Sequence, residues 1–204
     1  MDTMRTRAAR AAFVVVTVLF WMTVVLGLIV VADRLFGVFQ DSRLTVPASV
    51  PVTDVRLPET FEVGGPLPVN VDVVDPSLAQ RLIATAPVLA WWALALVVLW
   101  LVRGLARSAA HGDPFDGSNV TRLRWLGVLF LLGFPLAVTV GGYFNGLLFD
   151  PDVWTGGPLP SEGVNTSFPV VVSAPAILAA VCLFALAEVF AYGARLREDV
   201  DATI

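Results

Sequence analysis

The sequence predicts an all-α membrane protein, a four-helix transmembrane bundle with a small, irregular β-rich extracytoplasmic segment between the first two helices. Of its 204 residues, 57% are hydrophobic and 15% are charged, which lies outside the composition of soluble domains. Four long stretches also lack charged side chains, and about 20 apolar residues cross the ~30 Å hydrocarbon core of a bilayer. The predicted spans are residues 11–32, 82–102, 125–149 and 168–190.

The basic residues predict the orientation of these spans. All 13 are arginine, and nine lie before span one, between spans two and three, or after span four. Because basic residues near span ends are retained in the cytoplasm, we expect both termini, the loop 103–124 and the tail 193–204 to be cytoplasmic. The absence of lysine beside abundant alanine, valine and arginine indicates a high-GC bacterial genome and nothing finer.

The first span raises the alternative of a cleaved signal peptide. A basic head precedes residues 11–32, and Val30-Val31-Ala32 loosely fits a small-residue cleavage site. This apolar run is longer than the h-region of most cleaved signals, which has about 7–15 residues. We therefore favour an uncleaved span and treat residues 1–204 as a single membrane domain.

The segment 33–81 is predicted to be extracytoplasmic and β-rich. Apolar residues alternate with polar or proline positions in 44–57 and again in 69–73, the period of a strand. Prolines cannot donate a hydrogen bond to a strand ladder, so Pro47 and Pro68 restrict these strands to edges or short pairings. We expect a small sheet on the outer membrane face.

Helix ends, kinks and contact faces can also be predicted within the spans. Asp75-Pro76 predicts the start of helix two, with the aspartate as N-cap and the proline at the first helical position. Prolines inside a helix remove an N–H group and predict kinks at Pro87, Pro135 and Pro175. Small residues allow helices to approach closely in lipid, and two pairs lie one turn apart: Gly142 with Gly146, and Ala176 with Ala180. We interpret these pairs as contacts within one chain, with a homodimer as the alternative.

The most specific local pattern lies in the loop 103–124. Asp113, Pro114 and Phe115 predict a turn with an apolar staple at the membrane surface. Asp116 is a predicted N-cap, and Asn119, three residues later, is placed to complete a capping box. Helix three is therefore expected to begin before it enters lipid.

These residues resemble those of a known family. Residues 112–115 (Gly-Asp-Pro-Phe), Asn119, residues 122–127 (Arg-Leu-Arg-Trp-Leu-Gly) and the ending 186–204, with Gly193 and Leu196-Arg197-Glu198-Asp199, are similar to the bacterial membrane-protein family catalogued as domain of unknown function 2975. The resemblance covers spans two to four, whereas span one and the outer segment match only in layout. It implies a small four-span inner-membrane protein, often encoded beside a small helix-turn-helix regulator, with no known catalytic residue. Ala191-Tyr192 stands where family members often have an arginine pair.

Glu188 is the acidic residue nearest the hydrocarbon, where an unpaired carboxylate is costly. Our hypothesis is a structural ion pair that joins helix four to the inner ends of helices two and three. A solvated interfacial carboxylate and a role in proton or ion coupling are the alternatives. The candidate partners at the same membrane level are Arg103, Arg107, Arg122, Arg124 and Arg195.

Several kinds of chemistry are not expected. His111 is the only histidine and Cys182 the only cysteine, so neither a metal site of the usual type nor a disulfide is predicted. No serine lies in a nucleophile motif, and no glycine-rich loop has the ending of a P-loop. We therefore expect no enzyme activity and no cofactor. Direct nucleic-acid binding is not expected either, since arginines beside a membrane usually contact anionic lipid headgroups and the acidic residues of the tail oppose DNA.

Two function classes remain. The first is a non-enzymatic accessory or regulatory protein that couples the outer segment to a cytoplasmic partner. The second is a small-solute transporter or channel subunit, which needs more polar or ionisable residues inside the spans than are found here. The small polar residues in the span interiors are Thr17, Thr23, Thr85, Thr139, Asn145 and Ser173, with Glu188 at an edge. The sequence therefore favours the first class. The candidate structural or interaction residues are Arg103, Asp113, Pro114, Phe115, Asp116, Asn119, Arg122, Arg124, Glu188, Arg197, Glu198 and Asp199.

Overall fold

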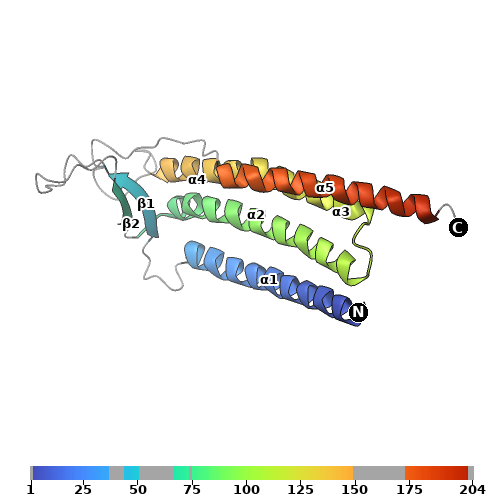
Figure 1. Cartoon of the computed structure of the whole chain (residues 1–204). Helices are drawn as coiled ribbons and strands as arrows, with labels where there is room; N and C mark the ends of the chain where they lie inside the picture. Colours follow the sequence, from blue (N-terminus) through green and yellow to red (C-terminus); the bar gives the residue numbers. More distant parts are fainter. Residues whose placement is uncertain (1, 37–43, 51–66, 74, 149–172, 202–204) are drawn as a thin grey trace, which may run out of the picture. The chain divides into compact units, whose positions relative to one another are not determined.

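The computed structural model describes residues 2–36, 44–50, 67–73, 75–148 and 173–201. Side chains are described for these residues except 2–7, 46–50, 67–72, 145, 198, 200 and 201. The elements in chain order are α1 (Asp2–Phe36), β1 (Leu44–Val50), β2 (Leu67–Val73), α2 (Leu78–Ala110), α3 (Gly117–Val128), the π-helix η2 (Leu129–Gly133), α4 (Phe134–Leu148) and α5 (Ala174–Asp201) (Figure 1).

Among the described residues, four helical runs are long and apolar enough to cross a membrane. They are Ala8–Phe36, Leu78–Ala110, Gly117–Leu148 and Ala174–Arg197. Large apolar side chains on them are exposed, among them Trp21, Leu132 and Leu178. Apolar surface of this extent is unfavourable in water but is solvated by the hydrocarbon of a lipid bilayer. The chain is therefore a multi-pass membrane protein with four apolar helices.

The helices are longer than the stretches that lack charges. α2 continues to Ala110 and α3 begins at Gly117, so that only residues 111–116 of the predicted loop 103–124 lie outside a helix. The predicted tail likewise continues α5 as far as Asp201. A helix does not end where its apolar stretch ends, because its backbone bonds are made within the helix and do not require lipid.

The described chain forms two compact units. The first contains residues 1–27, 91–137 and 171–204, and the second contains residues 28–90 and 138–170.

In the second unit, β1 and β2 form one antiparallel pair, with Leu44 opposite Val73 and Val50 opposite Leu67. Leu44 and Val73 pack with Ala84 of α2 and Leu148 of α4 in a small buried cluster. In a two-stranded sheet both strands are edges, so each of them tolerates a proline. The designation of 33–81 as β-rich is too broad, because its ends belong to α1 and α2 and the described strands are a single pair. Residues 37–43 and 51–66 of this segment lie outside the described residues.

α2 begins at Leu78, two residues later than the Pro76 start that the sequence predicts. The backbone N–H of Ser77 donates to Gln80 Oε1 at 2.8 Å, and that of Gln80 donates to Ser77 Oγ at 3.2 Å. These reciprocal bonds form a capping box with Ser77 as the N-cap. Asp75 has a φ of 52°, in the left-handed region outside the helix. The predicted cap at Asp75-Pro76 is therefore wrong.

Two of the three prolines lie where they can distort a helix. Pro87 lies inside α2, and Pro135 follows η2, a π-helical turn within the third span. π-turns are a recognised cause of helix distortion. Pro175 is the second residue of α5, where a missing N–H costs nothing because the first helical N–H groups have no partner in the helix. The prediction that Pro175 kinks helix four is therefore not met.

In the first unit, small residues bring helices into contact. Val120 and Leu123 of α3 form a buried cluster with Ala187 of α5. The ring of Phe184 lies 2.9 Å from the position that a Cβ on Gly127 would take. Ala176, Ala180 and Ala187 are buried along one helix, as the predicted contact pair Ala176 and Ala180 requires. On α1, the indole of Trp92 fills the space above Gly27 and donates to the carbonyl of Thr23 at 2.9 Å.

Candidate functional site

The loop between α2 and α3 leaves α2 through a turn built on Gly112. Gly112 has a φ of 83°, a left-handed conformation that glycine adopts without steric cost. The backbone N–H of Gly112 donates to Ala109 O, and that of Asp113 donates to Ser108 O, both at 3.2 Å. These two bonds define a Schellman motif. The hydroxyl of Ser108 also donates to the carbonyl of Asp113 at 2.5 Å, so the direction of the loop is fixed.

α3 starts after the predicted N-cap Asp116, but the predicted capping box is not formed. The side chain of Asn119, which is 1% exposed, donates to the carbonyl of Pro114 at 2.9 Å and accepts from Arg122 at 2.7 Å. In a capping box the side-chain oxygen at this position accepts from the backbone N–H of the cap, but here that oxygen accepts from Arg122 and the amide nitrogen donates to Pro114. Asn119 therefore holds the turn at Pro114 against the first turn of α3.

The carboxylate of Asp116 is stabilised in its ionised form. The hydroxyl of Ser118 donates to it, and this bond, with the backbone N–H groups at the start of α3 and the charge of Arg122, lowers the pKa of Asp116 below its ordinary value of 3.8. Desolvation opposes this shift without reversing it. A negative charge at the N-terminus of a helix is also favoured by the helix dipole.

The loop is bound to the end of α5 by an ion pair and an aromatic contact. Arg197 donates to the carboxylate of Asp113. The rings of Phe115 and Phe190 lie 5.3 Å apart between centroids. A Cβ on Gly193 would lie 2.8 Å from the ring of Phe115, so the ring packs directly on the α5 backbone. We call these five residues the loop–tail junction.

Glu188 of α5 pairs with Arg124 of α3. Glu188 Oε1 lies 2.8 Å from Arg124 Nη2, and both side chains are more than half exposed. The sequence offers five arginines as candidate partners of Glu188, and the structure shows that Arg124 is the partner. The pair therefore joins the fourth span to the third, and no ion pair among the described residues joins Glu188 to α2.

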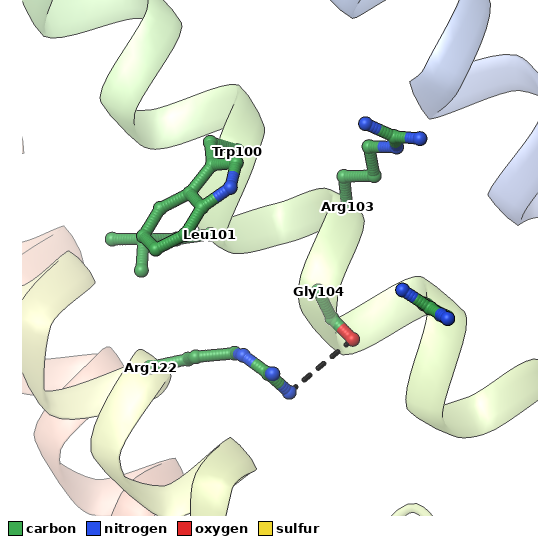
Figure 2. Close-up of a pocket in the computed structure, with 6 residues that line it drawn as sticks. Trp100, Leu101, Arg103, Gly104 and Arg122 are labelled. Atoms are coloured by element: carbon green, nitrogen blue, oxygen red, sulfur yellow. Dashed lines mark hydrogen bonds between the residues drawn. The ribbon is translucent and has the colours of Figure 1, made fainter.

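Three arginines line a cleft between α2 and α3. The cleft has a volume of about 250 Å³ and is lined by Trp100, Leu101, Arg103, Gly104, Arg107 and Arg122. Arg122 extends towards Gly104 and donates to its carbonyl at 3.4 Å (Figure 2). A Cβ on Gly104 would lie 2.6 Å from Arg122 Nε, so the absence of a side chain at Gly104 leaves room for the guanidinium group of Arg122. Arg103 instead lies over the rings of Phe13 and Phe20 of α1, at 5.8 and 5.7 Å from their centroids.

The predicted candidate residues thus separate into groups. Asp113, Phe115 and Arg197 meet at the loop–tail junction, while Pro114, Asp116, Asn119 and Arg122 organise the start of α3. Arg124 pairs with Glu188, and Arg103 lies at the cleft. Asp199 lies exposed on α5 and has an interaction of its own, whereas the side chain of Glu198 is outside the described residues.

Sequence reasoning did not name Gly104, Gly193 or Phe190 as candidate site residues, although Gly193 and Phe190 belong to the family resemblance. A glycine inside an otherwise continuous helix costs stability, and its presence indicates a close approach by another group. That signal was available at Gly104 and Gly193. Among the residues that the structure describes, no group of three or more His, Cys, Asp or Glu side chains is placed to hold a metal ion.

Comparison with known proteins gives one match. A protein-family model described as "Protein of unknown function (DUF2975)" matches residues 6–204, so the match extends over the first span and the outer segment, where we expected agreement only in layout. No curated protein and no solved structure matches the chain.

Proposed function

Because the chain belongs to the DUF2975 family of proteins of unknown function, we propose a role from its own geometry: it is a non-enzymatic accessory or regulatory protein that couples an extracytoplasmic segment to a cytoplasmic partner. In this proposal the protein lies in the bacterial inner membrane with both termini in the cytoplasm. The distribution of arginines supports that orientation, since nine of 13 flank the ends assigned to the cytoplasm.

The single observation that carries the proposal is the loop–tail junction. Asp113 and Phe115 of the loop are bound to Arg197, Phe190 and Gly193 of α5, outside or at the ends of the apolar stretches. A surface assembled from the ends of three spans is ordered before a partner arrives, which lowers the entropic cost of binding. A partner bound here would also contact spans two, three and four together. Its binding would therefore be linked to how these helices pack.

The partner that family resemblance implies, a small helix-turn-helix regulator, would have a basic surface. The tail of this chain carries Glu198, Asp199 and Asp201, so the charges are complementary. We propose that this chain contacts the regulator directly, protein to protein, and does not itself bind nucleic acid.

The alternative, a small-solute transporter or channel subunit, receives less support from the spans. The hydroxyl of Thr23 donates to Leu19 O at 2.9 Å, and that of Thr85 donates to Arg81 O at 2.6 Å. Hydroxyls bonded to the preceding turn of their own helix have used their donor hydrogen, so they offer a solute only acceptor lone pairs. A homodimer remains compatible with either role.

Site-specific photo-crosslinking in native membranes tests the proposal. A photoreactive residue is placed at His111 in the loop or at Arg195 on α5, both exposed, with Leu178, which is exposed on an apolar span, as the matched control. We expect a reproducible adduct with one cytoplasmic protein from positions 111 and 195 and none from position 178. The adduct should be lost in the Asp113→Ala, Phe115→Ala double variant, which opens the junction.

Absence of an adduct at both positions, together with solute flux in liposomes that contain the purified protein, would replace the accessory role by the transporter alternative.

A further inference from the structure

The arginine-lined cleft is separate from the loop–tail junction and has a chemistry of its own. Its lining comes from about two turns of α2 (Trp100, Leu101, Arg103, Gly104 and Arg107) and from Arg122 of α3. One water occupies about 30 Å³ of liquid, so a volume of about 250 Å³ admits a group of several heavy atoms.

The three guanidinium groups of the cleft have no carboxylate within ion-pair distance among the described residues. Arg122 donates to three neutral acceptors: Asn119 Oδ1 at 2.7 Å, Ser118 Oγ at 3.0 Å and Gly104 O at 3.4 Å. Arg103 lies over two phenylalanine rings, which leave its charge in place. The charge of Arg122 acts on the carboxylate of Asp116, which accepts its hydrogen bond from Ser118 and not from an arginine of the cleft. The lining therefore has three positive charges and no negative one, and an anion bound there would relieve their mutual repulsion.

Guanidinium groups suit one class of anion in particular. Their planar donors match the oxygen atoms of a phosphate group and form charge-assisted, bidentate hydrogen bonds with it. Arg122 is held in place by its three hydrogen bonds, and Arg103 stands at another edge of the cleft, towards α1 (Figure 2). A pre-positioned donor loses less side-chain entropy on binding than a free one.

The apolar part of the lining indicates where such a phosphate would come from. Trp100 is 62% exposed, whereas Leu101 is 6% exposed, and both lie within one helical turn before Arg103, the first arginine of the cleft. Tryptophan is enriched where the hydrocarbon meets the headgroups, and basic pockets between spans bind anionic headgroups. We propose that this cleft binds the phosphate group of an anionic phospholipid, with the acyl chains leaving along the side of Trp100.

Binding of defined lipids by the purified full-length protein in a neutral detergent tests this inference. The probes are dioleoyl-phosphatidylglycerol, dioleoyl-phosphatidylethanolamine and inorganic phosphate, each titrated while the melting temperature is measured. The test variant is Arg107→Gln, since Arg107 is exposed and makes no side-chain bond among the described residues. The matched control is Arg195→Gln, which removes the same charge from an exposed site on α5.

We expect phosphatidylglycerol to stabilise the protein more than phosphatidylethanolamine does. Arg107→Gln should weaken its apparent affinity by about fivefold or more, and Arg195→Gln by less than about twofold, because only Arg107 lines the site. Equal losses in the two variants would reduce the effect to diffuse attraction and overturn the site. Equal stabilisation by the two lipids would also overturn it. If inorganic phosphate alone reproduced the effect and phosphatidylglycerol did not, the ligand would be a soluble phosphate and the lipid assignment would be wrong. None of these outcomes depends on the proposed cytoplasmic partner.

Discussion

At the scale of single residues, glycines decide how closely large side chains approach the helices. A Cβ on Gly27 would overlap the indole of Trp92, which donates to the carbonyl of Thr23. We expect Gly27→Ala to displace this ring and to lower the free energy of unfolding by about 1–3 kcal/mol, as overpacking usually does. Thermal unfolding in detergent, followed by tryptophan fluorescence, measures the change.

Gly117 supplies the control for that substitution. A Cβ at Gly117 would meet nothing within 4 Å, and the residue begins α3. Gly117→Ala should therefore leave stability unchanged or raise it by about 0.4–1 kcal/mol through the unfolded chain. If the two variants melted at the same temperature, the close packing of Trp92 on Gly27 would not be a determinant of the fold.

Asp116 gives the start of α3 a dependence on pH. Because its pKa is lowered in the folded protein, its contribution to stability is present above its ordinary value of 3.8 and is lost as pH falls through the lower, folded value. We expect amide protection of residues 117–120, corrected for intrinsic exchange, to be constant well above pH 3.8 and to fall as the pH is lowered through 3.8 towards the folded pKa. Asp116→Asn should remove this dependence. An equal loss of protection in that variant would assign the effect to another group.

At the scale of elements, α3 and α5 are joined by apolar packing and by the ion pair between Arg124 and Glu188. The side chains of Arg124 and Glu188 are 53% and 70% exposed, so solvent and headgroups screen their attraction. A double-mutant cycle with Arg124→Gln and Glu188→Gln should give a coupling energy of about 0.2–1 kcal/mol from melting curves in detergent. Glu188→Gln with Arg195→Gln should show none. A coupling of zero in the first cycle would remove the structural role of Glu188.

The π-turn in the third span makes a second prediction about an element. A π-turn contains one residue more than an α-turn, so deletion of Leu132 from η2 can convert it to α-helix and keep α3 and α4 in register. The same deletion at Leu178, in the regular helix α5, rotates the buried face by about 100°. We expect the first variant to remain folded in detergent and the second to aggregate, as size-exclusion chromatography would show. The reverse order would mean that η2 is required for stability.

The elements also show what sequence reasoning could and could not predict. The four spans were predictable because lipid requires long apolar helices, whatever their partners. The N-cap of α2 was not predictable, because two adjacent cap signals, Asp75-Pro76 and Ser77 with Gln80, occur in the sequence. The backbone decides between them: Asp75 has a φ of 52°, outside the helix, and Ser77 is the N-cap. The partner of Glu188 was also open. Its choice depends on the rotation of α3 against α5, which Gly127 and Ala187 fix through packing.

At the scale of the whole molecule, orientation in the membrane decides which surface a partner or a lipid headgroup can reach. The cleft and the loop–tail junction both lie among the arginines that the positive-inside rule retains in the cytoplasm. The proposed partner and the proposed lipid therefore share one premise. It can be tested without either ligand.

Cysteine accessibility in intact cells tests this orientation. The one native cysteine, Cys182, is exposed and is first replaced by serine, after which Thr60→Cys and His111→Cys report on the outer segment and the loop. A maleimide that cannot cross the bilayer should label position 60 in intact cells and position 111 only after permeabilisation, because translocating nine flanking arginines is unfavourable. A variant with Cys182 alone replaced controls for background labelling. Labelling of position 111 but not of position 60 in intact cells would invert the topology and place the junction outside the cell, beyond the reach of a cytoplasmic partner.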